Sequence, residues 1–397
     1  EIRLSLVGSE MCIRDRTWAE VDLDALAHNY EVICRHVGEK TKLLGVIKAD
    51  AYGHGAVPVA KELEALGASY LAVSNIDECE EVRLGGVALP VLMLGFTPAD
   101  QAERILALDM TQAVQSLDIA EAFSDAAVKC GKKMKVHIKL DTGMGRLGFL
   151  CDEAHFDESL RDILAVLRLP GLDVEGVFTH FCVADEEGEE NVAFTRTQHE
   201  RFLRMIGEAE TRSGFRFRLR HCCNAGGIVC YPEWAGDMVR CGIILYGSGS
   251  LAEKMGMEPV MSLKTRVATV RALAPGTSVS YGRTYFTERE SRIAVLPIGY
   301  ADGLHRALSN RMEVLTPYGR ARQVGRICMD MCMIDVTDLP EVKSGDEVEI
   351  FGKNVLCAED AGQCGTIPYE LLCAVSKRVP RHYFLHGKRV SADLAPL

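Results

Sequence analysis

The residue with the clearest chemical potential is Lys48, which directly follows an apolar, strand-like run at residues 42–47. An amine at the end of a buried strand is costly to keep charged, so it is a candidate for a lowered pKa and Schiff-base chemistry. Tyr52, Gly53 and Gly55 follow, and their hydroxyl and backbone N–H groups suit a phosphate. A reactive amine beside a phosphate site points to pyridoxal phosphate (PLP). The competing interpretation is a lysine whose stem lines the strand end and whose head reaches water.

Short apolar strands alternate with amphipathic helices from Thr17 to about Gly247. Apolar residues at i, i+3 and i+4 predict helices that include residues 57–66, 102–108 and 198–211. This alternation is typical of parallel strands joined by crossover helices. Eight strands favour a closed (β/α)₈ barrel, although an open doubly wound sheet would share much of the pattern. The strands are predicted to begin at Lys42, Ser69, Pro90, Thr111, Met134, Leu172, Phe217 and Asp237.

The pattern changes after residues 248–259, where short strands such as 266–271 and 347–350 are separated by turns. We therefore predict a PLP-binding barrel at residues 17–256 and a mostly-β domain at residues 257–397. Residues 1–16 do not fit the rest of the chain and lack the features of an export signal. They are predicted to be an artefact or a non-native extension.

Composition narrows the class of protein. Apolar residues make up 48% of the 397 residues and charged residues 25%, which describes an ordinary globular protein with a sizeable core. The net charge of −11 argues against a nucleic-acid partner, and no apolar run is long enough to predict a membrane span. The 15 cysteines show no metal-type spacing. They favour reduced thiols in a cytoplasmic enzyme over a disulfide framework, with no metal site.

A barrel predicts where the chemistry should lie, because barrel enzymes build their sites at the carboxyl ends of the strands. Lys48 ends the first predicted strand, and residues 141–146 follow the fifth. Residues 179–180 end the sixth, Asn224 follows the seventh, and residues 240–242 end the eighth. Polar residues at so many strand ends predict one shared site at this end of the barrel.

Several of these segments closely resemble alanine racemase, a PLP enzyme of fold type III, and the similarity covers nearly the whole chain from Thr17 onward. The resemblance implies an α/β fold, with an N-terminal (β/α)₈ barrel followed by a mostly-β domain. It also implies a cytoplasmic homodimer with shared active sites that interconverts L-alanine and D-alanine and supplies D-alanine for peptidoglycan. Eight blocks carry it in family order: residues 46–55, 137–148, 178–181, 237–243, 279–285, 297–303, 324–330 and 365–370.

The resemblance implies a two-base mechanism. Lys48 holds the cofactor and serves one face of the substrate, and Tyr281 of the partner subunit serves the other. A tyrosine with a pKa of about 10 is a poor base, so His180 and Arg240 are expected to support it through a hydrogen-bonded chain. Arg240 is also expected to donate to the cofactor's ring nitrogen without protonating it fully. Outside the motifs, these three supporting and catalytic side chains would be interpreted as buried structural residues.

The remaining expected site residues also follow from the resemblance. Arg146 contacts the substrate carboxylate and the cofactor's phenolic oxygen, and Lys139 occupies a position that is carbamylated in several members of the family. Met329 presents its backbone amide to the substrate carboxylate. The phosphate is expected to contact the hydroxyls of Tyr52 and Tyr369 and the backbone near Asn224, Gly242 and Ile243. The substrate corridor is expected to include Asp185, Tyr300, Arg306 and Arg326.

Three positions depart from the family pattern. Ala225 replaces the usual serine, which removes one hydroxyl contact to the phosphate, worth ~1 kcal/mol. Met331 stands where glutamine is common, and Pro368 where asparagine or serine is, so preference among alanine, serine and other amino acids stays open. A non-catalytic PLP-binding barrel and a fold-type-III decarboxylase would also contain a barrel with a PLP-binding lysine. Tyr281 and Met329 count against the non-catalytic barrel, and the glycine-rich phosphate loop and second-domain cysteine of the decarboxylases are not recognised in this sequence.

Overall fold

The computed structural model describes residues 16–395. These residues form two compact units, each drawn from more than one stretch of chain. The barrel unit comprises Val21–Met261, Ile367–Cys373 and the chain from Tyr383, and the β unit comprises the chain up to Glu20, Ser262–Thr366 and Ala374–His382. The expectation for residues 1–16 lies outside the described residues, apart from Arg16. The predicted bounds 17–256 and 257–397 stay a prediction.

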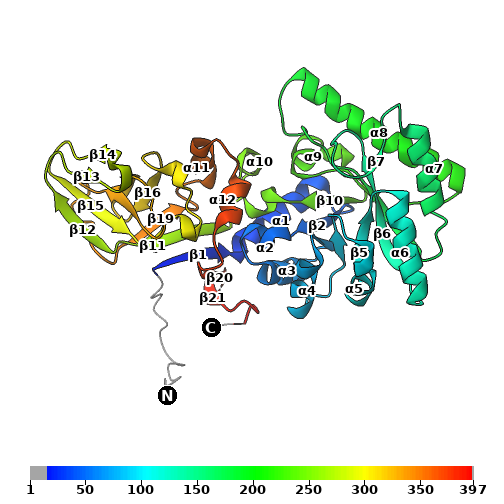
Figure 1. The fold of residues 1–397 in the computed structure, drawn as a ribbon, viewed down its shortest axis with the longest axis horizontal. Coiled ribbons are helices and arrows are strands. Elements are labelled where there is room, and N and C mark those ends of the chain that lie inside the picture. The colour runs from blue at the N-terminus through cyan, green and yellow to red at the C-terminus, as the bar shows by residue number, and fades with distance from the viewer. Residues whose placement is uncertain (1–15, 396–397) are drawn as a thin grey trace, which may run out of the picture. The chain divides into compact units, whose positions relative to one another are not determined.

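Eight parallel strands form the main path of the barrel sheet, in the order β10-β2-β3-β4-β5-β6-β8-β9 (Figure 1). The sheet nearly closes, because Asp237 N–H donates to Arg220 O at 3.1 Å and Arg240 N–H donates to Cys223 O at 3.0 Å. The barrel prediction is therefore confirmed over an open sheet. The strands are β2 (Lys42–Val46), β3 (Tyr70–Val73), β4 (Val91–Met93), β5 (Met110–Val114), β6 (Met134–Asp141), β8 (Leu172–Phe178), β9 (Leu219–His221) and β10 (Met238–Cys241).

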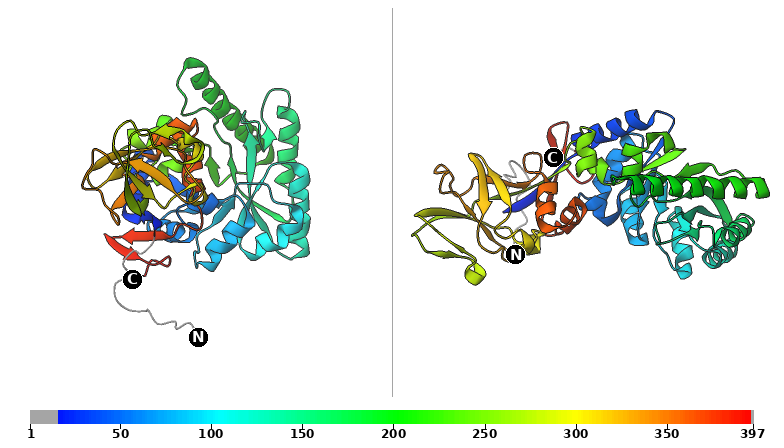
Figure 2. Two further views of the ribbon diagram at one scale, coloured as in Figure 1. Left: turned by 60° about the vertical axis from the view of Figure 1, so that its left-hand side comes forward. Right: turned by 90° about the horizontal axis from the view of Figure 1, so that it is seen from above.

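Helices cover the outer side of this sheet (Figure 2). In α6 the buried residues Ala120, Phe123 and Ala127 recur about one turn apart, so a single apolar stripe faces the strands. The Asn75 side chain accepts from Glu78 N–H and caps the start of α4, and Gly214, at φ 73°, ends α8. The covering helices are α3 (Ala56–Ala65), α4 (Ile76–Leu84), α5 (Ala102–Ala107), α6 (Leu117–Lys129), α7 (Phe156–Val166) and α8 (Glu189–Ser213).

The β unit is mostly β, as the sequence predicts, and its strands pair antiparallel. Buried and half-buried residues alternate along β11 (Met261–Arg266), so one face of this strand packs on the core. A local cluster of Val279, Ile293 and Val324 lies beside the hairpin of β13 (Ser278–Val279) and β14 (Tyr285–Phe286). The other strands of this unit's sheet include β12 (Thr269–Leu273), β15 (Ser291–Leu296), β16 (Glu313–Thr316), β17 (Gly319–Gln323), β18 (Cys332–Asp335) and β19 (Glu347–Phe351).

No helix among residues 16–395 has the length and apolar character that crossing a membrane requires.

Candidate active site

The carboxyl ends of the barrel strands bring the predicted barrel residues together. Lys48 follows β2, Asp141 ends β6, His180 follows β8, and Arg240 lies in β10. Because the strands are parallel, all of these ends meet at one rim. His180 reports on this convergence, since burial and the cations of Arg240, Lys139, Arg146 and Lys48 hold its pKa well below the usual value. The placement predicted from strand ends is therefore what the structure shows.

Lys48 stands at the entrance to a left-handed turn of the backbone. Ala49, Asp50, Ala51 and Tyr52 have φ values of 53°, 54°, 52° and 55°. Left-handed residues other than glycine cost roughly 1–2 kcal/mol each, so surrounding contacts must hold this turn. Among these, the Glu78 carboxylate accepts from Ala49 N–H at 2.8 Å. The sequence did not reveal this left-handed turn.

The Lys48 amine is half-buried, and its pKa is lowered first by burial and then by the nearby guanidinium of Arg146. The carboxylate of Glu78 acts in the opposite direction. A lowered pKa raises the fraction of neutral amine, which is the nucleophilic form. The rim therefore gives Lys48 the character that Schiff-base chemistry requires.

Asp141 organises the loop that carries Arg146. Its carboxylate accepts from Gly143 N–H at 2.9 Å, Gly145 N–H at 3.1 Å and Arg146 N–H at 2.9 Å. At Gly148, with φ 128°, an added Cβ would lie 2.7 Å from Asp141 N, so only glycine fits the return of the loop. The backbone of Arg146 is thus fixed while its side chain stays exposed.

Lys139 is buried in β6, with its Nζ 4.5 Å from the centre of the Phe178 ring. Burial and the cations of Arg240 and Arg146 lower its pKa well below the usual value, and only Asp141 acts against them. A protonated amine would place another positive charge among these cations. The site therefore favours either a neutral Lys139 amine or a modified, anionic form.

Arg240 is buried and bound from several sides. One terminal nitrogen donates to His221 O at 3.0 Å and lies 3.1 Å from His221 Nδ1. The other donates to Thr179 O at 2.7 Å and Cys222 O at 3.1 Å, and lies 3.4 Å from His180 Nδ1. Burial lowers the pKa of Arg240 to about 10, so it stays protonated at neutral pH. Arg240 and His180 therefore lie within reach of each other, and their role in supporting Tyr281 stays a prediction.

The part of the rim predicted to bind phosphate has the right donors. Burial raises the pKa of Tyr52, and burial together with Asp185 raises that of Tyr369 to about 12, so both hydroxyls keep their protons to donate. Their rings lie 5.9 Å apart between centres. An added Cβ at Gly242 would lie 3.1 Å from the Tyr52 oxygen, so glycine keeps the space beside that hydroxyl open. Neutral hydroxyls beside the Gly242 and Ile243 backbone fit a phosphate dianion.

Asn224 caps the short helix α9 (Ala225–Cys230), because its Oδ1 accepts from Gly227 N–H at 3.2 Å. Its Nδ2 donates to Phe181 O at 3.1 Å and lies 3.4 Å from His180 Nε2. The Arg240 N–H bond to Cys223 O aligns the ends of β9 and β10. The two predicted phosphate-binding segments therefore lie next to each other.

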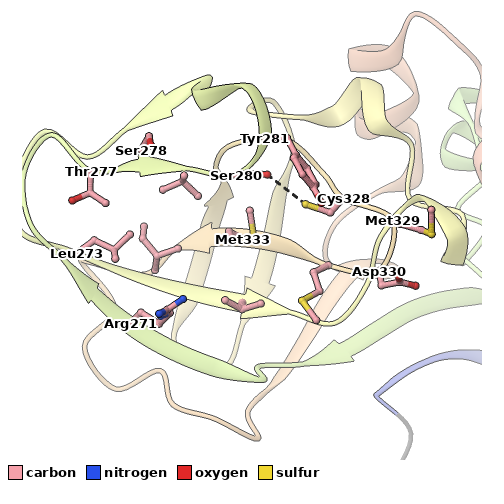
Figure 3. A pocket seen from close by; sticks show the side chains of 14 residues that line it. Arg271, Leu273, Thr277, Ser278, Ser280, Tyr281, Cys328, Met329, Asp330 and Met333 are labelled. Atoms are coloured by element: carbon pink, nitrogen blue, oxygen red, sulfur yellow. Dashed lines mark hydrogen bonds between the residues drawn. The ribbon is translucent and has the colours of Figure 1, made fainter.

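Tyr281 and Met329 lie on a different feature, an open groove of about 720 Å³ in the β unit (Figure 3). Its lining includes Leu273, Ile293 and Met333, and the Tyr281 and Met329 side chains are 71% and 54% exposed. Large side chains this open to water, gathered on one apolar groove, are typical of a surface that another molecule covers.

Hydrogen bonds connect the loops that carry Met329 and Tyr300. Tyr300 begins the turn η5 (Tyr300–Asp302), and its N–H donates to Cys328 O at 3.0 Å. Arg378 donates to the buried Asp302 at 2.7 Å and to Asp330 at 2.6 Å. The β unit therefore holds these two predicted site segments in one fixed arrangement.

The remaining corridor residues divide between the two units. Asp185 is exposed in the barrel unit and lies close enough to Tyr369 to raise its pKa. In the β unit, Arg306 is exposed, and Arg326 packs on Gly282, where an added Cβ would lie 3.1 Å from Arg326 Nε. The chain thus carries the predicted site in two groups, one at the barrel rim and one in the β unit.

Known proteins match the chain across both units. Residues 21–250 match the family "Alanine racemase, N-terminal domain", and residues 260–383 match "Alanine racemase, C-terminal domain". The chain belongs to the alanine racemase family. Alanine racemase from Desulforamulus reducens is 44% identical over 376 residues, which is 94% of this chain and 100% of that protein. The enzyme of the same name from Clostridium perfringens is 44% identical over 382 residues, covering 94% and 96%.

Solved structures give the same family. Alanine racemase from Clostridium difficile 630 has a TM-score of 0.89 at 39% identity and covers 96% of this chain and 98% of its own. Alanine racemase from Bacillus anthracis, solved with bound L-Ala-P, has a TM-score of 0.84 at 34% identity, with 95% and 97% covered. The predicted family, fold class and enzyme class are therefore confirmed. The individual roles of the site residues stay predictions.

Two residues that contribute to the active-site rim of the barrel were not predicted from the sequence. His221 touches Arg240, and the only available signal was a histidine three positions before Asn224, on the apolar face of a strand in which arginine alternates with Phe217 and Leu219. Glu78 supports the Lys48 turn and also accepts from Ser74 N–H at 2.8 Å. Its signal was the capping pattern of Asn75 and Glu78, which indicates a helix start and nothing about the lysine.

Proposed function

We propose that this member of the alanine racemase family interconverts L-alanine and D-alanine with PLP as cofactor and two bases on opposite faces of the substrate. The observation that carries the proposal is the convergence of Lys48, Arg240 and the Tyr52 hydroxyl at one barrel rim. PLP, when bound, supplies the electron sink that makes the Cα proton acidic.

Each barrel residue then has a defined task. Tyr52 and Tyr369, with the Gly242 and Ile243 backbone, hold the phosphate at the rim. Arg240 would donate a hydrogen bond to the ring nitrogen of PLP, and because a guanidinium keeps its proton, it would not transfer a full proton to that nitrogen. The Lys48 amine would hold the cofactor and would remove or return the proton on one face of the substrate. These tasks fit the protonated hydroxyls of the buried Tyr52 and the half-buried Tyr369, and the half-buried Lys48 amine.

Tyr281 serves the opposite face and comes from a second copy of the chain. Two observations support this assignment: its side chain is largely exposed, and Met329 lines the same apolar groove. In a homodimer each rim would receive Tyr281 and the Met329 backbone amide from its neighbour. His180 and Arg240 would then support the tyrosine through hydrogen bonds, and Asp185, Tyr300, Arg306 and Arg326 would line the path for small zwitterions.

Arg146 orients the substrate carboxylate, since a planar guanidinium can bind a carboxylate through two parallel hydrogen bonds. Carbamylation would convert the buried Lys139 amine into an anion near Arg240 and Arg146, which the local excess of positive charge favours. We further propose that the enzyme works in the cytoplasm and that its D-alanine is used for peptidoglycan.

Chiral chromatography of L-alanine incubated with the purified protein and PLP tests this function. The expected result is equal amounts of L- and D-alanine at equilibrium, since enantiomers have the same free energy. L-alanine that remains unchanged by folded, cofactor-loaded protein would refute the proposal. Parallel incubations with L-serine and L-lysine distinguish a dedicated alanine racemase from a broader one, which Met331 on the groove leaves open.

A further inference from the structure

A row of polar side chains crosses the interior of the barrel to Arg240, and the proposed mechanism uses only its last member. The Tyr70 hydroxyl of β3 donates to the Glu175 carboxylate of β8. Glu175 Oε2 lies 3.5 Å from His137 Nε2, and His137 Nδ1 lies 2.9 Å from His221 Nε2. His221 Nδ1 in turn lies 3.1 Å from the Arg240 guanidinium.

The packing shows that this row is built into the core. His137 and His221 are fully buried, while the Glu175 side chain is 21% exposed. An added Cβ at Gly176 would lie 2.8 Å from the His137 ring, so glycine admits that ring. The Phe178 ring stacks on His221 at 4.9 Å and 4°. Strands β3 and β8 are not neighbours in the sheet, so the Tyr70–Glu175 contact crosses the barrel interior.

Each neutral histidine carries its proton on one of two ring nitrogens, and only one choice for His137 and His221 pairs a donor with an acceptor along the row. This choice is called the proton order. An arginine donates and never accepts, so a neutral His221 must offer Nδ1 as acceptor and carry its proton on Nε2. That proton then points at His137 Nδ1, which leaves the His137 proton on Nε2, the nitrogen nearest the negative charge of Glu175; this contact is electrostatic, because its geometry falls outside that of a hydrogen bond. A carboxylate only accepts, so the order is the same when it is derived from the other end. Burial, which lowers the pKa of both histidines, keeps them neutral.

We propose that Glu175, assisted by Tyr70, is a positioning residue for Arg240 and acts through His137 and His221. Its carboxylate fixes the proton order, and this order directs the lone pair of His221 Nδ1 at the guanidinium. With the opposite order, an N–H of His221 would face an N–H of Arg240, and the guanidinium would lose one of its anchors. The inference rests on the proposed function, because that function gives Arg240 its role at the cofactor ring.

Neutron diffraction from crystals of the cofactor-loaded enzyme exchanged into D₂O tests the proton order directly. The expected map shows deuterium on Nε2 and none on Nδ1 of both His137 and His221. Deuterium on Nδ1 of either ring overturns the proposal. The map does not depend on turnover. If the protein shows the expected proton order but has no racemase activity, the proposed function is refuted and the proposed proton order stands.

Variants at Glu175 test the consequence for catalysis. Glu175→Ala should lower kcat about tenfold, the effect of one lost orienting hydrogen bond, with KM changed less than about twofold. Glu175→Gln keeps an acceptor and should recover at least half of the lost kcat, while Glu153→Ala, at an exposed glutamate paired with Arg204, should leave kcat unchanged. An unchanged kcat in Glu175→Ala, or no recovery in Glu175→Gln, overturns the proposal. The neutron map of the unaltered enzyme decides the question if Glu175→Ala does not fold.

Discussion

Replacing Arg240 by lysine should destabilise the barrel as well as slow the reaction. The guanidinium lies within hydrogen-bond distance of five acceptors: three carbonyl oxygens and two histidine nitrogens. A lysine keeps the charge but has a single nitrogen in place of the two terminal nitrogens, and one nitrogen cannot reach both sets of acceptors, so at least two buried acceptors lose a donor. At ~1–2 kcal/mol for each acceptor, Arg240→Lys should lower the free energy of unfolding by ~2–4 kcal/mol.

Urea denaturation at a fixed PLP concentration measures this loss. A change of this size is a large share of the free energy of unfolding of a typical domain, so the midpoint of the transition should move to a clearly lower urea concentration. Arg161→Lys is the matched control, because Arg161 is exposed on α7, and its change should stay within about 0.5 kcal/mol. An Arg240→Lys protein as stable as this control would refute the reasoning that Arg240 is held by the barrel.

Four other substitutions test separate parts of the site and fold. Lys48→Ala should abolish the visible absorbance of the bound cofactor, and retained absorbance would exclude Lys48 as the anchor. Tyr281→Phe should slow deuterium exchange from one alanine enantiomer more than from the other; equal slowing argues against a one-sided role. Ala225→Ser adds a hydroxyl near the phosphate and should tighten PLP retention about fivefold, equivalent to ~1 kcal/mol, in equilibrium dialysis. Burial raises the pKa of Asp360 from its usual value near 4 to about 7. The folded protein therefore favours a protonated Asp360, and its free energy of unfolding falls as the pH rises through this range. Asp360→Asn should therefore exceed the parent by about 2–4 kcal/mol at pH 8 and show no advantage at pH 4; equal gains at both pH values would contradict the assignment.

Much of the fold could be predicted from the sequence, because the spacing of the apolar residues and the lengths of the apolar segments indicate which elements form. The predicted strand starts, for example Lys42 and Met134, fall within two residues of the observed ones. The (β/α) alternation also placed Lys48, His180 and Arg240 at strand ends, and the structure gathers them at one rim. Local pattern is sufficient here because parallel strands with short connections leave few other arrangements.

The features that could not be predicted depend on contacts between distant residues. Nothing in Ala49-Asp50-Ala51-Tyr52 indicates a left-handed turn, since its stability comes partly from Glu78 in α4, which lies 26 or more positions further along the chain. In the same way, Glu175, His137 and His221 look like isolated polar residues in strands until the barrel closes around them. Short-range patterns report which element forms, and only the closed sheet decides which inward side chains meet.

The central claim, that each active site joins Lys48 of one copy with Tyr281 of another, can be tested most directly by mixing two inactive variants. Lys48→Ala and Tyr281→Phe subunits are unfolded together, refolded in equal amounts and assayed for D-alanine formation. Random pairing makes half of the dimers mixed, each with one intact composite site, so about a quarter of the wild-type activity should return. Verified mixed dimers that recover no activity would contradict the claim.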